Sequence, residues 1–521
     1  MSQQHRIIAI IALIVALGGL LMGFDASVIS GVVKFIEPEF GLSKLELGWA
    51  VASLTLTSTL AMLLAGPLSD RIGRRSVLRL AAIIYLLSAL GSALAPNFAI
   101  LVIARMIGGF GVGASLILAP MYIAEISPAG LRGRMVSFNQ LNIVVGISAA
   151  FFSNYLILQM GDWDTAWVQN LGIKEHNWRW MLGLEVLPAL LYFLGLFFVP
   201  RSPRWLVMKG HYDEALQVMR RYRAEETARA EIKDIRQSLE EKKDQKVKVT
   251  QLTVLFSPGL RQVLIIGVVV AILQQITGIN SVFFYAPMIF EQSGIGTDAS
   301  FVQAILVGLT NLVFTVLAIL FIDKLGRKPL LIFGVAGIAI SMFVLSYGFS
   351  TARYTLTEDS VSELSSEVDH QALAPLTGKT FSTDVSYRLA VEKALGEKAA
   401  TTHKSALIAA AIDMNPALIL IAILSFVASF AISIGPVMWV LFSELFPNAI
   451  RGLAISAVGL INSTVSFLVQ WVFPWELDHF GSALTFLLYG LFALAGFLFI
   501  FRYVPETKGR SLEELEADLT S

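Results

Sequence analysis

Cysteine is absent from the 521 residues, which excludes disulfides and thiolate chemistry. Charge is also scarce: Asp, Glu, Lys and Arg make up 15% of the chain, against about 25% in soluble domains. Acidic and basic residues balance to a formal net charge of zero, so nothing in the composition favours a nucleic-acid partner. Hydrophobic residues, in contrast, reach 55%. These proportions predict an integral membrane protein.

Apolar runs of about 20 residues, the length a helix needs to cross a bilayer core of about 30 Å, recur along the sequence. They predict an all-α membrane protein with twelve transmembrane helices. The first run is too long for the core of a signal peptide, so we expect it to remain as a span. The predicted spans are 7–33, 47–69, 77–95, 98–124, 135–159, 179–199, 262–290, 301–322, 329–349, 416–443, 453–473 and 482–503.

Basic residues gather in the loops after even-numbered spans, as with Arg74 and Arg75 after the second span and Lys328 after the eighth. The positive-inside rule predicts that these loops, and with them both termini, are cytoplasmic. The polar segment 201–261 falls on the same side. Its alternating charges predict cytoplasmic amphipathic helices.

Two motifs occur once in each half of the chain. DRIGRR at 70–75 returns as DKLGRK at 323–328, and a Glu-to-Arg pair returns at the same spacing. The pairs are Glu125 with Arg132 and Glu444 with Arg451. Parallel repeats of this kind are a transporter architecture, with the binding site at their interface. The expected domains are an N-terminal six-helix bundle at 1–200, a cytoplasmic helical linker at 201–261, a C-terminal six-helix bundle at 262–505 and a cytoplasmic tail at 506–521.

The second half also carries an insertion between its third and fourth spans, at about 350–415, on the outer face. Its Ser, Thr, Glu, Asp and Ala content is compatible with a small cap over the mouth or with a disordered loop. The Ala, Glu and Lys content of 388–411 favours a partly helical segment.

The stretch QQITGINSVFFY at 274–285 places three amides in an apolar run. An unpaired amide in hydrocarbon costs several kcal/mol, so Gln274, Gln275 and Asn280 should face a polar cavity. Thr277 and Gly278 mark a point where the helix can unwind toward a ligand. The alternative is that the amides hold helices together. Three in one run favour a binding site for a hydroxyl-rich solute.

Asp25 is an acid inside the first span, so it must pair or bind a proton. Arg105 is the expected partner, because both residues lie about 13 Å below the outer surface at 1.5 Å per residue. Asp25 could take a proton from outside, loosen from Arg105 and couple proton entry to solute entry. The alternative is a fixed pair that locks the N-terminal bundle. Glu185, a second membrane acid, is expected to support this region or a helix contact.

Ten stretches of the chain match one known family: GFDASVISG, GPLSDRIGRR, RMIGGFGVG, PMYIAEISPAGLRGR, NWRWMLGLE, QQITGIN, DKLGRKP, GPVMW, SELFPNAIRG and PETKG. On these stretches the chain resembles the sugar porter family of the major facilitator superfamily, most closely its bacterial D-xylose:proton symporters. The resemblance covers nearly the whole chain outside 350–415 and implies two six-helix bundles that rock about a central sugar. In proton symporters of the family an aspartate occupies the position of Asp25, whereas facilitative glucose carriers usually have an asparagine.

The resemblance adds residues to both candidate sites. For sugar binding it implies Gln140, Asn311, Trp439 and Asn462 beside the three amides. Trp439 would present an apolar ring face to the C–H side of a sugar, and the alternative is that its ring only packs within the bundle. Phe284 and Ser463 replace a tyrosine and a tryptophan common in the family, and Arg201 replaces an acid. For inner-gate salt bridges that break as the bundles rock, it implies Asp70, Arg71, Arg74, Arg75, Glu125 and Arg132, with their counterparts Asp323, Arg327, Glu444 and Arg451.

These observations predict a proton-coupled symporter of pentose- or hexose-type monosaccharides that works by alternating access. The expected partners are the sugar and the lipid bilayer, with the proton as coupling ion, no other cofactor, no metal and a functional monomer in the inner (plasma) membrane. No metal-ligand spacing, nucleophile elbow or phosphate loop occurs, so an enzyme is not expected. The alternatives are an uncoupled facilitative carrier, against which Asp25 argues, and a sugar sensor, which the short tail after Tyr503 disfavours.

Overall fold

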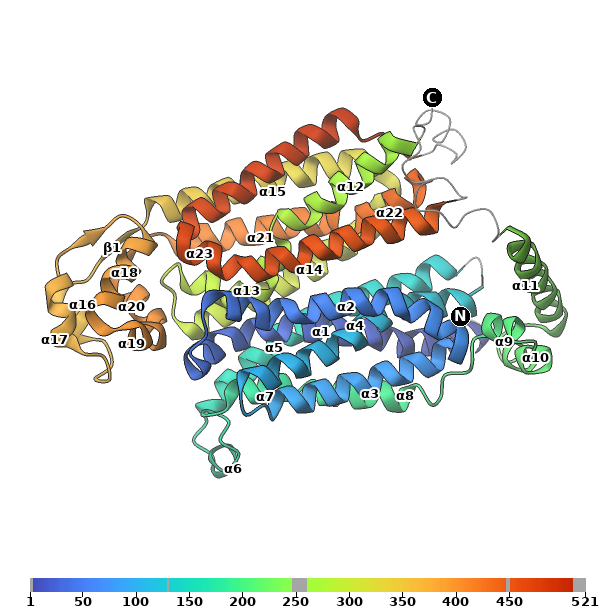
Figure 1. Cartoon of the computed structure of the whole chain (residues 1–521), viewed down its shortest axis with the longest axis horizontal. Coiled ribbons are helices and arrows are strands. Elements are labelled where there is room, and N and C mark those ends of the chain that lie inside the picture. Colours follow the sequence, from blue (N-terminus) through green and yellow to red (C-terminus); the bar gives the residue numbers. More distant parts are fainter. Residues whose placement is uncertain (1–2, 129–130, 246–259, 447–449, 509–521) are drawn as a thin grey trace.

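The structure is a computed structural model that describes residues 3–128, 131–245, 260–446 and 450–508. It is mostly helical, and the long helices run side by side along one axis in two layers (Figure 1). The first half of the chain forms the lower layer of Figure 1 and the second half forms the upper layer. We refer to them as the N-terminal and C-terminal bundles.

The helices of the N-terminal bundle follow the predicted apolar runs, and α1, α2 and α5 extend beyond them at both ends. α1 begins well before the predicted span and continues through Pro38. The helices are α1 (Gln3–Phe40), α2 (Lys44–Ile72), α3 (Arg74–Ala93), α4 (Phe98–Ile126), α5 (Arg132–Gly161), α6 (Ala166–Asn170), α7 (Asn177–Gly183) and α8 (Val186–Gly195).

The C-terminal bundle contains broken helices. α12 ends at Ile276 and α13 begins at Ile279, where the sequence predicted a weak point, and Gly278 between them has a φ of 87°. A side chain at Gly278 would also meet the ring of Tyr489, because an added Cβ would lie 2.4 Å from it. The helices are α12 (Arg261–Ile276), α13 (Ile279–Glu291), α14 (Thr297–Leu325), α15 (Arg327–Thr351), α21 (Pro416–Ile432), α22 (Ile434–Leu445) and α23 (Arg451–Tyr503).

Ten helical segments of the described residues are long and apolar enough to cross a membrane, against the twelve expected from the sequence. Two features account for the difference. α7 and α8 are short and separated near Glu185, so neither is long enough alone. α23 runs through 53 residues and covers two predicted spans, with Gly481 at a φ of 76° as its one non-helical residue.

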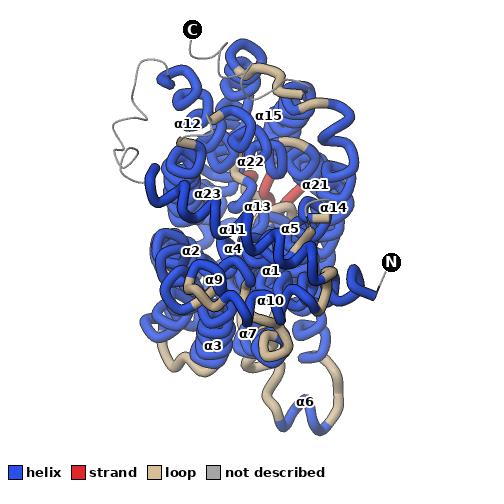
Figure 2. Tube along the Cα trace, turned by 90° about the vertical axis from the view of Figure 1, so that its right-hand side faces the viewer, coloured by secondary structure: helices blue, strands red, loops and turns tan. Residues whose placement is uncertain are grey.

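The two ends of the molecule differ. At one end, here the linker end, lie α9 (Pro203–Met208), α10 (Tyr212–Arg220) and α11 (Glu225–Gln245). Figure 2 views the molecule from this end, with these helices in front of the N-terminal bundle. At the opposite end, here the cap end, lies a compact unit formed by residues 353–413, which we name the cap.

The cap has a core of its own, which includes Tyr354, Leu373, Tyr387 and Leu407. Its three short strands are antiparallel in the order β2-β1-β3, and Arg353 of β1 pairs with Asp413 of β3. The elements are β1 (Arg353–Thr355), α16 (Glu358–Ser362), α17 (His370–Leu373), η3 (Ala374–Leu376), β2 (Thr380–Phe381), α18 (Asp384–Leu395), α19 (Glu397–Thr402), α20 (Lys404–Ala411) and β3 (Ile412–Asp413).

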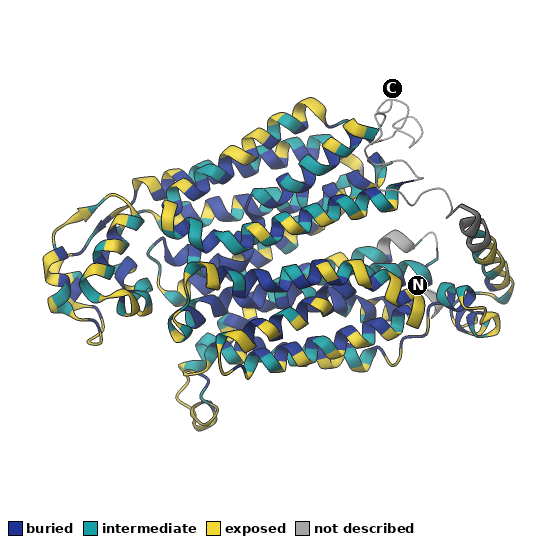
Figure 3. Ribbon diagram, viewed as in Figure 1, coloured by how far each residue is buried: buried dark blue, intermediate teal, exposed yellow. Residues whose placement is uncertain are grey.

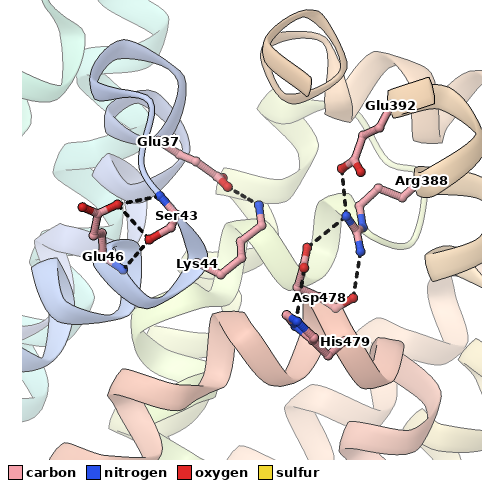
Figure 4. Close-up of polar contacts among 8 residues, drawn as sticks. All are labelled: Glu37, Ser43, Lys44, Glu46, Arg388, Glu392, Asp478 and His479. Atoms are coloured by element: carbon pink, nitrogen blue, oxygen red, sulfur yellow. Dashed lines mark hydrogen bonds and ion pairs between the residues drawn. The ribbon is translucent and has the colours of Figure 1, made fainter. Parts of the chain in front are cut away.

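Polar contacts attach the cap to α23. Asp384 Oδ2 accepts hydrogen bonds from the Ser482 backbone N–H at 2.8 Å and from its hydroxyl at 2.9 Å. Arg388 lies 3.3 Å from a carboxylate oxygen of Asp478, as Figure 4 shows. A cavity of about 50 Å³ separates this region from Lys44 of α2. Burial lowers the pKa of the Lys404 ammonium at this cavity, and the charge of Lys44 adds to the effect.

The two bundles contact each other at the cap end. Lys34 Nζ of α1 lies 2.5 Å from Glu291 Oε1 of α13, and the Trp471 indole N–H of α23 donates to the Leu45 carbonyl at 3.1 Å. α2 packs so closely on α23 that a Cβ added at Gly48 would lie 1.9 Å from the Trp471 carbonyl oxygen. Toward the linker end the layers diverge, and buried residues concentrate within each layer and where the layers meet (Figure 3).

Candidate functional site

A buried acid–arginine cluster lies in the N-terminal bundle. Asp25 of α1 and Arg105 of α4 are 2% and 1% exposed, and Asp25 Oδ1 lies 3.5 Å from Arg105 Nη1. Arg105 Nε also donates to the carbonyl of Ala50 on α2 at 3.0 Å. Charges removed from water need such partners, because their desolvation is otherwise uncompensated. The arginine thus ties together α1, α2 and α4.

The same cluster contains oxygen atoms without hydrogen bonds. Glu185 is 2% exposed and close enough to Asp25 and Arg105 to interact with both electrostatically. In the described part of the chain, Asp25 Oδ2 and Glu185 Oε1 have no hydrogen-bond partner. One guanidinium therefore lies near two carboxyl groups, and all three side chains are almost fully buried. Binding a single proton would remove this imbalance of charge.

A buried amide cluster lies in the C-terminal bundle, where α12 breaks. Asn462 Nδ2 of α23 donates to Gln274 Oε1 at 2.9 Å, and Gln275 Nε2 donates to Asn462 Oδ1 at 3.2 Å. Asn280, in the first turn of α13, donates to Gln275 Oε1 at 2.8 Å and to Ser466 Oγ at 2.7 Å. The helix break brings the amides on its two sides together, and α23 completes the cluster.

The amide cluster is neutral and continues into the backbone. Gln274 Nε2 donates to the carbonyls of Ile434 and Gly435, each at 3.2 Å, at the start of α22. Each amide both donates and accepts hydrogen bonds, as does each hydroxyl of a sugar. A sugar can therefore replace internal hydrogen bonds with its own at little cost in desolvation. The arrangement suits a hydroxyl-rich ligand.

The residues added by family resemblance are not all brought into this cluster. Asn462 belongs to it. Asn311 of α14 is 7% exposed, Gln140 of α5 is exposed, and neither forms a hydrogen bond with the described cluster residues. Trp439 of α22 is 45% exposed, and its ring lies edge-on against Phe442 at 5.9 Å between centroids.

Repeated charges at the linker end form equivalent contacts in the two bundles. In the N-terminal bundle, Arg74 lies 2.7 Å from Asp70 and 3.2 Å from Glu125. In the C-terminal bundle, Arg327 lies 2.8 Å from Glu444. Each glutamate also accepts a hydroxyl hydrogen bond from the segment after the bundle's last helix. The donors are Ser202 to Glu125 at 2.5 Å and Thr507 to Glu444 at 2.6 Å.

Other predicted gate residues have different surroundings. Arg75 donates to the Val199 carbonyl at 3.1 Å, and Arg451 donates to the Phe446 carbonyl at 3.1 Å. Arg71 is exposed. The side chains of Arg132 and Asp323 lie outside the described part of the structure.

The departure at Arg201 has a visible consequence. Its counterpart in the second half, Glu506, accepts hydrogen bonds at 3.1 Å from the backbone N–H groups of Arg327 and Lys328, at the beginning of α15. Arg201 cannot accept such bonds and instead lies 3.2 Å from Glu214 of α10. The first half has therefore exchanged a helix cap for a contact with the linker helices.

Sequence reasoning missed Gln470, which is 1% exposed on α23 and hydrogen-bonded to Thr55 of α2 at 2.8 Å. The signal was available, because an amide within an apolar run drew attention to Gln274 and Gln275. Gln470 lies in the predicted span 453–473 and follows Asn462 by about two helical turns.

Comparisons with known proteins agree on the family. The family model described as "Sugar (and other) transporter" matches residues 11–364 and 398–519, which leaves the middle of the cap unmatched. The chain is similar to the D-xylose-proton symporter of Escherichia coli (strain K12), with 36% identity over 97% of this chain and 94% of the relative. It is also similar to the arabinose-proton symporter of Bacillus subtilis (strain 168), with 34% identity over 99% of this chain and 96% of the relative.

Solved structures of the xylose transporter XylE from E. coli have the same fold. A partially occluded inward open conformation gives a TM-score of 0.72 at 33% identity and covers 97% of this chain and 99% of that one. XylE bound to 6-bromo-6-deoxy-D-glucose gives 0.68 at 35% identity, with 98% and 99% covered. The structure has a major facilitator fold, and the chain belongs to the sugar transporter family.

Proposed function

We propose that this protein is a proton-coupled symporter of pentose- or hexose-type monosaccharides that works by alternating access. One observation carries the proposal: a buried cluster of two acids and one arginine lies in one bundle, and a buried cluster of neutral amides lies in the other. Relatives described as D-xylose-proton and arabinose-proton symporters support this assignment.

In this mechanism Asp25 is the proton-coupling acid. Its ionised form pairs with Arg105, and its protonated form releases the arginine. Glu185 is the second acid that interacts with Arg105. Arg105 also holds the carbonyl of Ala50, so a change at Asp25 is transmitted to α2. Since α2 packs on α23 of the other bundle, this is a route by which protonation alters the contact between the bundles.

The sugar site is built from Gln274, Gln275, Asn280 and Asn462, whose hydrogen bonds with one another are exchanged for bonds to sugar hydroxyls. Trp439, Gln140 and Asn311 are further candidates that approach the sugar as the bundles move. The partial exposure of the Trp439 ring supports a role as an apolar face for the C–H side of a sugar.

The proposed topology has twelve crossings, with α7 and α8 forming the sixth and α23 forming the last two on either side of Gly481. The domains are the two six-helix bundles at 1–200 and 262–505, the linker at 201–261, the insertion at about 350–415 and the tail at 506–521. The linker end and both termini are cytoplasmic in a multi-pass inner-membrane protein that functions as a monomer in the lipid bilayer. Contacts between the bundles at the cap end support an inward-facing state.

The repeated charges at the linker end act as the inner gate. Arg74 with Asp70 and Glu125, and Arg327 with Glu444, are paired within their own bundles in the inward-facing state. We propose that Arg71, Arg75 and Arg451, together with Arg132 and Asp323, complete the set when the inner side closes. Pairs of this kind make such an interface bistable, because partners are exchanged between two arrangements.

The test is uptake of labelled pentoses, hexoses and polyols by proteoliposomes, with and without an imposed proton gradient. Accumulation of a monosaccharide above its external concentration, only in the presence of the gradient, is the expected result. Equal rates with and without the gradient would identify an uncoupled carrier. Sugar binding without uptake would identify a sensor.

A further inference from the structure

Gln470 of α23 forms side-chain hydrogen bonds with both bundles. Its side chain is 1% exposed and lies where the two bundles meet toward the cap end. Gln470 Oε1 accepts a hydrogen bond from the Thr55 hydroxyl of α2 at 2.8 Å, across the boundary between the bundles. Its Nε2 donates to Ser466 Oγ at 2.7 Å, one turn back on α23. Both ends of the amide are therefore engaged, each with a different bundle.

The Ser466 hydroxyl connects this contact to the amide cluster. Its oxygen accepts a second hydrogen bond from Asn280 Nδ2 at 2.7 Å, and Asn280 also donates to Gln275 Oε1 at 2.8 Å. An unbroken chain of hydrogen bonds thus runs from the proposed sugar site to α2 of the opposite bundle. A ligand that draws Asn280 away from Ser466 therefore changes the hydrogen bonding of the hydroxyl to which Gln470 donates.

The backbone of Gln470 also lies near the acid–arginine cluster. The Tyr285 hydroxyl donates to the Gln470 carbonyl at 3.0 Å, and Tyr285 is close enough to Arg105 to interact electrostatically. Arg105 in turn holds the carbonyl of Ala50 on α2, the helix that carries Thr55. Gln470 therefore lies between the two proposed sites, with a hydrogen-bonded neighbour on the side of each.

Opening of the cap end separates α2 from α23 and removes Thr55 from Gln470. The amide oxygen then loses its partner, and an unmatched buried acceptor is unfavourable unless water replaces the partner. The Thr55–Gln470 bond thus favours the closed arrangement of the cap end. A ligand shifts such an equilibrium only by binding its two states with different affinities. Ser466, which accepts hydrogen bonds from both Asn280 and Gln470, connects the sugar site to the closed state.

We propose that Gln470 is a positioning residue that transmits occupancy of the sugar site to closure of the cap end. The proposal rests on the proposed function, in which the cap end is the outer side. A polar residue that only holds two helices together would stabilise the closed state equally with and without sugar. Dependence of the closed state on sugar is therefore the property to measure.

The natural absence of cysteine makes the chain a clean background for a single thiol reporter. Ala52 suits this purpose, because it is 0% exposed and lies on the α2 face that carries Gly48 and Thr55. In Ala52→Cys, a membrane-impermeant thiol reagent applied from outside should react only when α2 and α23 separate. The labelling rate in right-side-out vesicles then reports opening of the cap end.

We expect Gln470→Leu to raise the labelling rate without sugar about fivefold, the effect of one hydrogen bond. Thr55→Val should have the same effect, and the double variant should add nothing further, because both changes remove one bond. Sugar should slow labelling of the Ala52→Cys parent and leave the rate of Gln470→Leu unchanged, although that variant still binds sugar. As a matched control, Thr59→Val removes a hydroxyl that donates to the Thr55 carbonyl within α2, and this variant should label like the parent.

The proposal is wrong if sugar slows labelling of Gln470→Leu as much as it slows labelling of the parent, or if the two single effects add. Should Gln470→Leu fail to fold, Thr55→Val, which leaves α23 intact, carries the same comparison. Proton-driven uptake by the parent is measured in the same vesicles. Its absence counts against the proposed function, whereas an unchanged sugar response of the variants counts against Gln470 alone.

Discussion

The two bundles are alike at the linker end and different in their interiors. At the linker end each has an arginine, a glutamate and a hydroxyl in the same contact. In the interior the N-terminal bundle buries Asp25, Arg105 and Glu185, while the C-terminal bundle buries only neutral amides in its cluster. Buried charge responds strongly to one proton, and neutral amides exchange hydrogen bonds with a solute at little cost. A duplicated scaffold has thus come to hold two different kinds of chemistry.

Asp25→Asn removes the charge that distinguishes the N-terminal interior and should have the largest effect. Uphill accumulation of sugar should be abolished, because an Asn side chain beside Arg105 neither binds nor releases a proton. Counterflow exchange in proteoliposomes should persist, since the sugar site is unchanged. Glu476→Gln is the control, because this acid of α23 lies outside the acid–arginine cluster and accepts from Tyr489. Full proton-driven uptake by Asp25→Asn would refute the coupling role.

Arg74→Ala and Arg327→Ala test the likeness at the linker end. Each removes the partner of a glutamate, but the Glu125 side chain is 6% exposed and that of Glu444 is 23% exposed. Loss of a buried partner costs about 3 kcal/mol, so Arg74→Ala should lower the unfolding temperature in detergent more than Arg327→Ala. Equal shifts would mean that the two contacts are energetically interchangeable.

Gln275→Ala removes the amide that bonds to Asn280 and Asn462. We expect the sugar KM to rise about tenfold, since a lost hydrogen bond to a buried group costs roughly 1–2 kcal/mol. Dependence of uptake on the proton gradient should remain. Asn142→Ala, which removes an amide bonded to a carbonyl of its own helix, is the matched control. A normal KM in Gln275→Ala would exclude this residue from the sugar site.

Glu506→Ala and Arg201→Ala test the smallest difference between the bundles. Loss of the Glu506 cap on α15 should cost about 1 kcal/mol of stability. The Arg201 side chain is 47% exposed, so loss of its pair with Glu214 should cost about 0–1 kcal/mol. Chemical unfolding of the two variants measures the difference. A larger loss for Arg201→Ala would show that the contact with the linker helices stabilises the protein more than the Glu506 helix cap on α15 does.

The apolar runs and the break near Gly278 were predictable, because hydrophobic length and a glycine between two amides are local signals. Contact between the α12 amides and Asn462 was not, since only the fold brings such distant segments together. The orientation of Trp439 and Gln140 was also beyond the sequence, because it depends on how far each helix is rotated and which side of the transporter is open. In the cap, composition indicated helix, but strands of two or three residues leave no periodic signal.

Because β1 and β3 are neighbours in one sheet, the chain enters and leaves the cap at the same place. With both ends of the cap side by side, its length has little effect on the spacing of α15 and α21, although Asp384 and Arg388 also anchor it to α23. An insertion whose ends are neighbours can differ in length between relatives while the helices on either side keep their positions. The family model matches the chain on both sides of residues 365–397 but not within them, as expected if the length of the cap varies in the family.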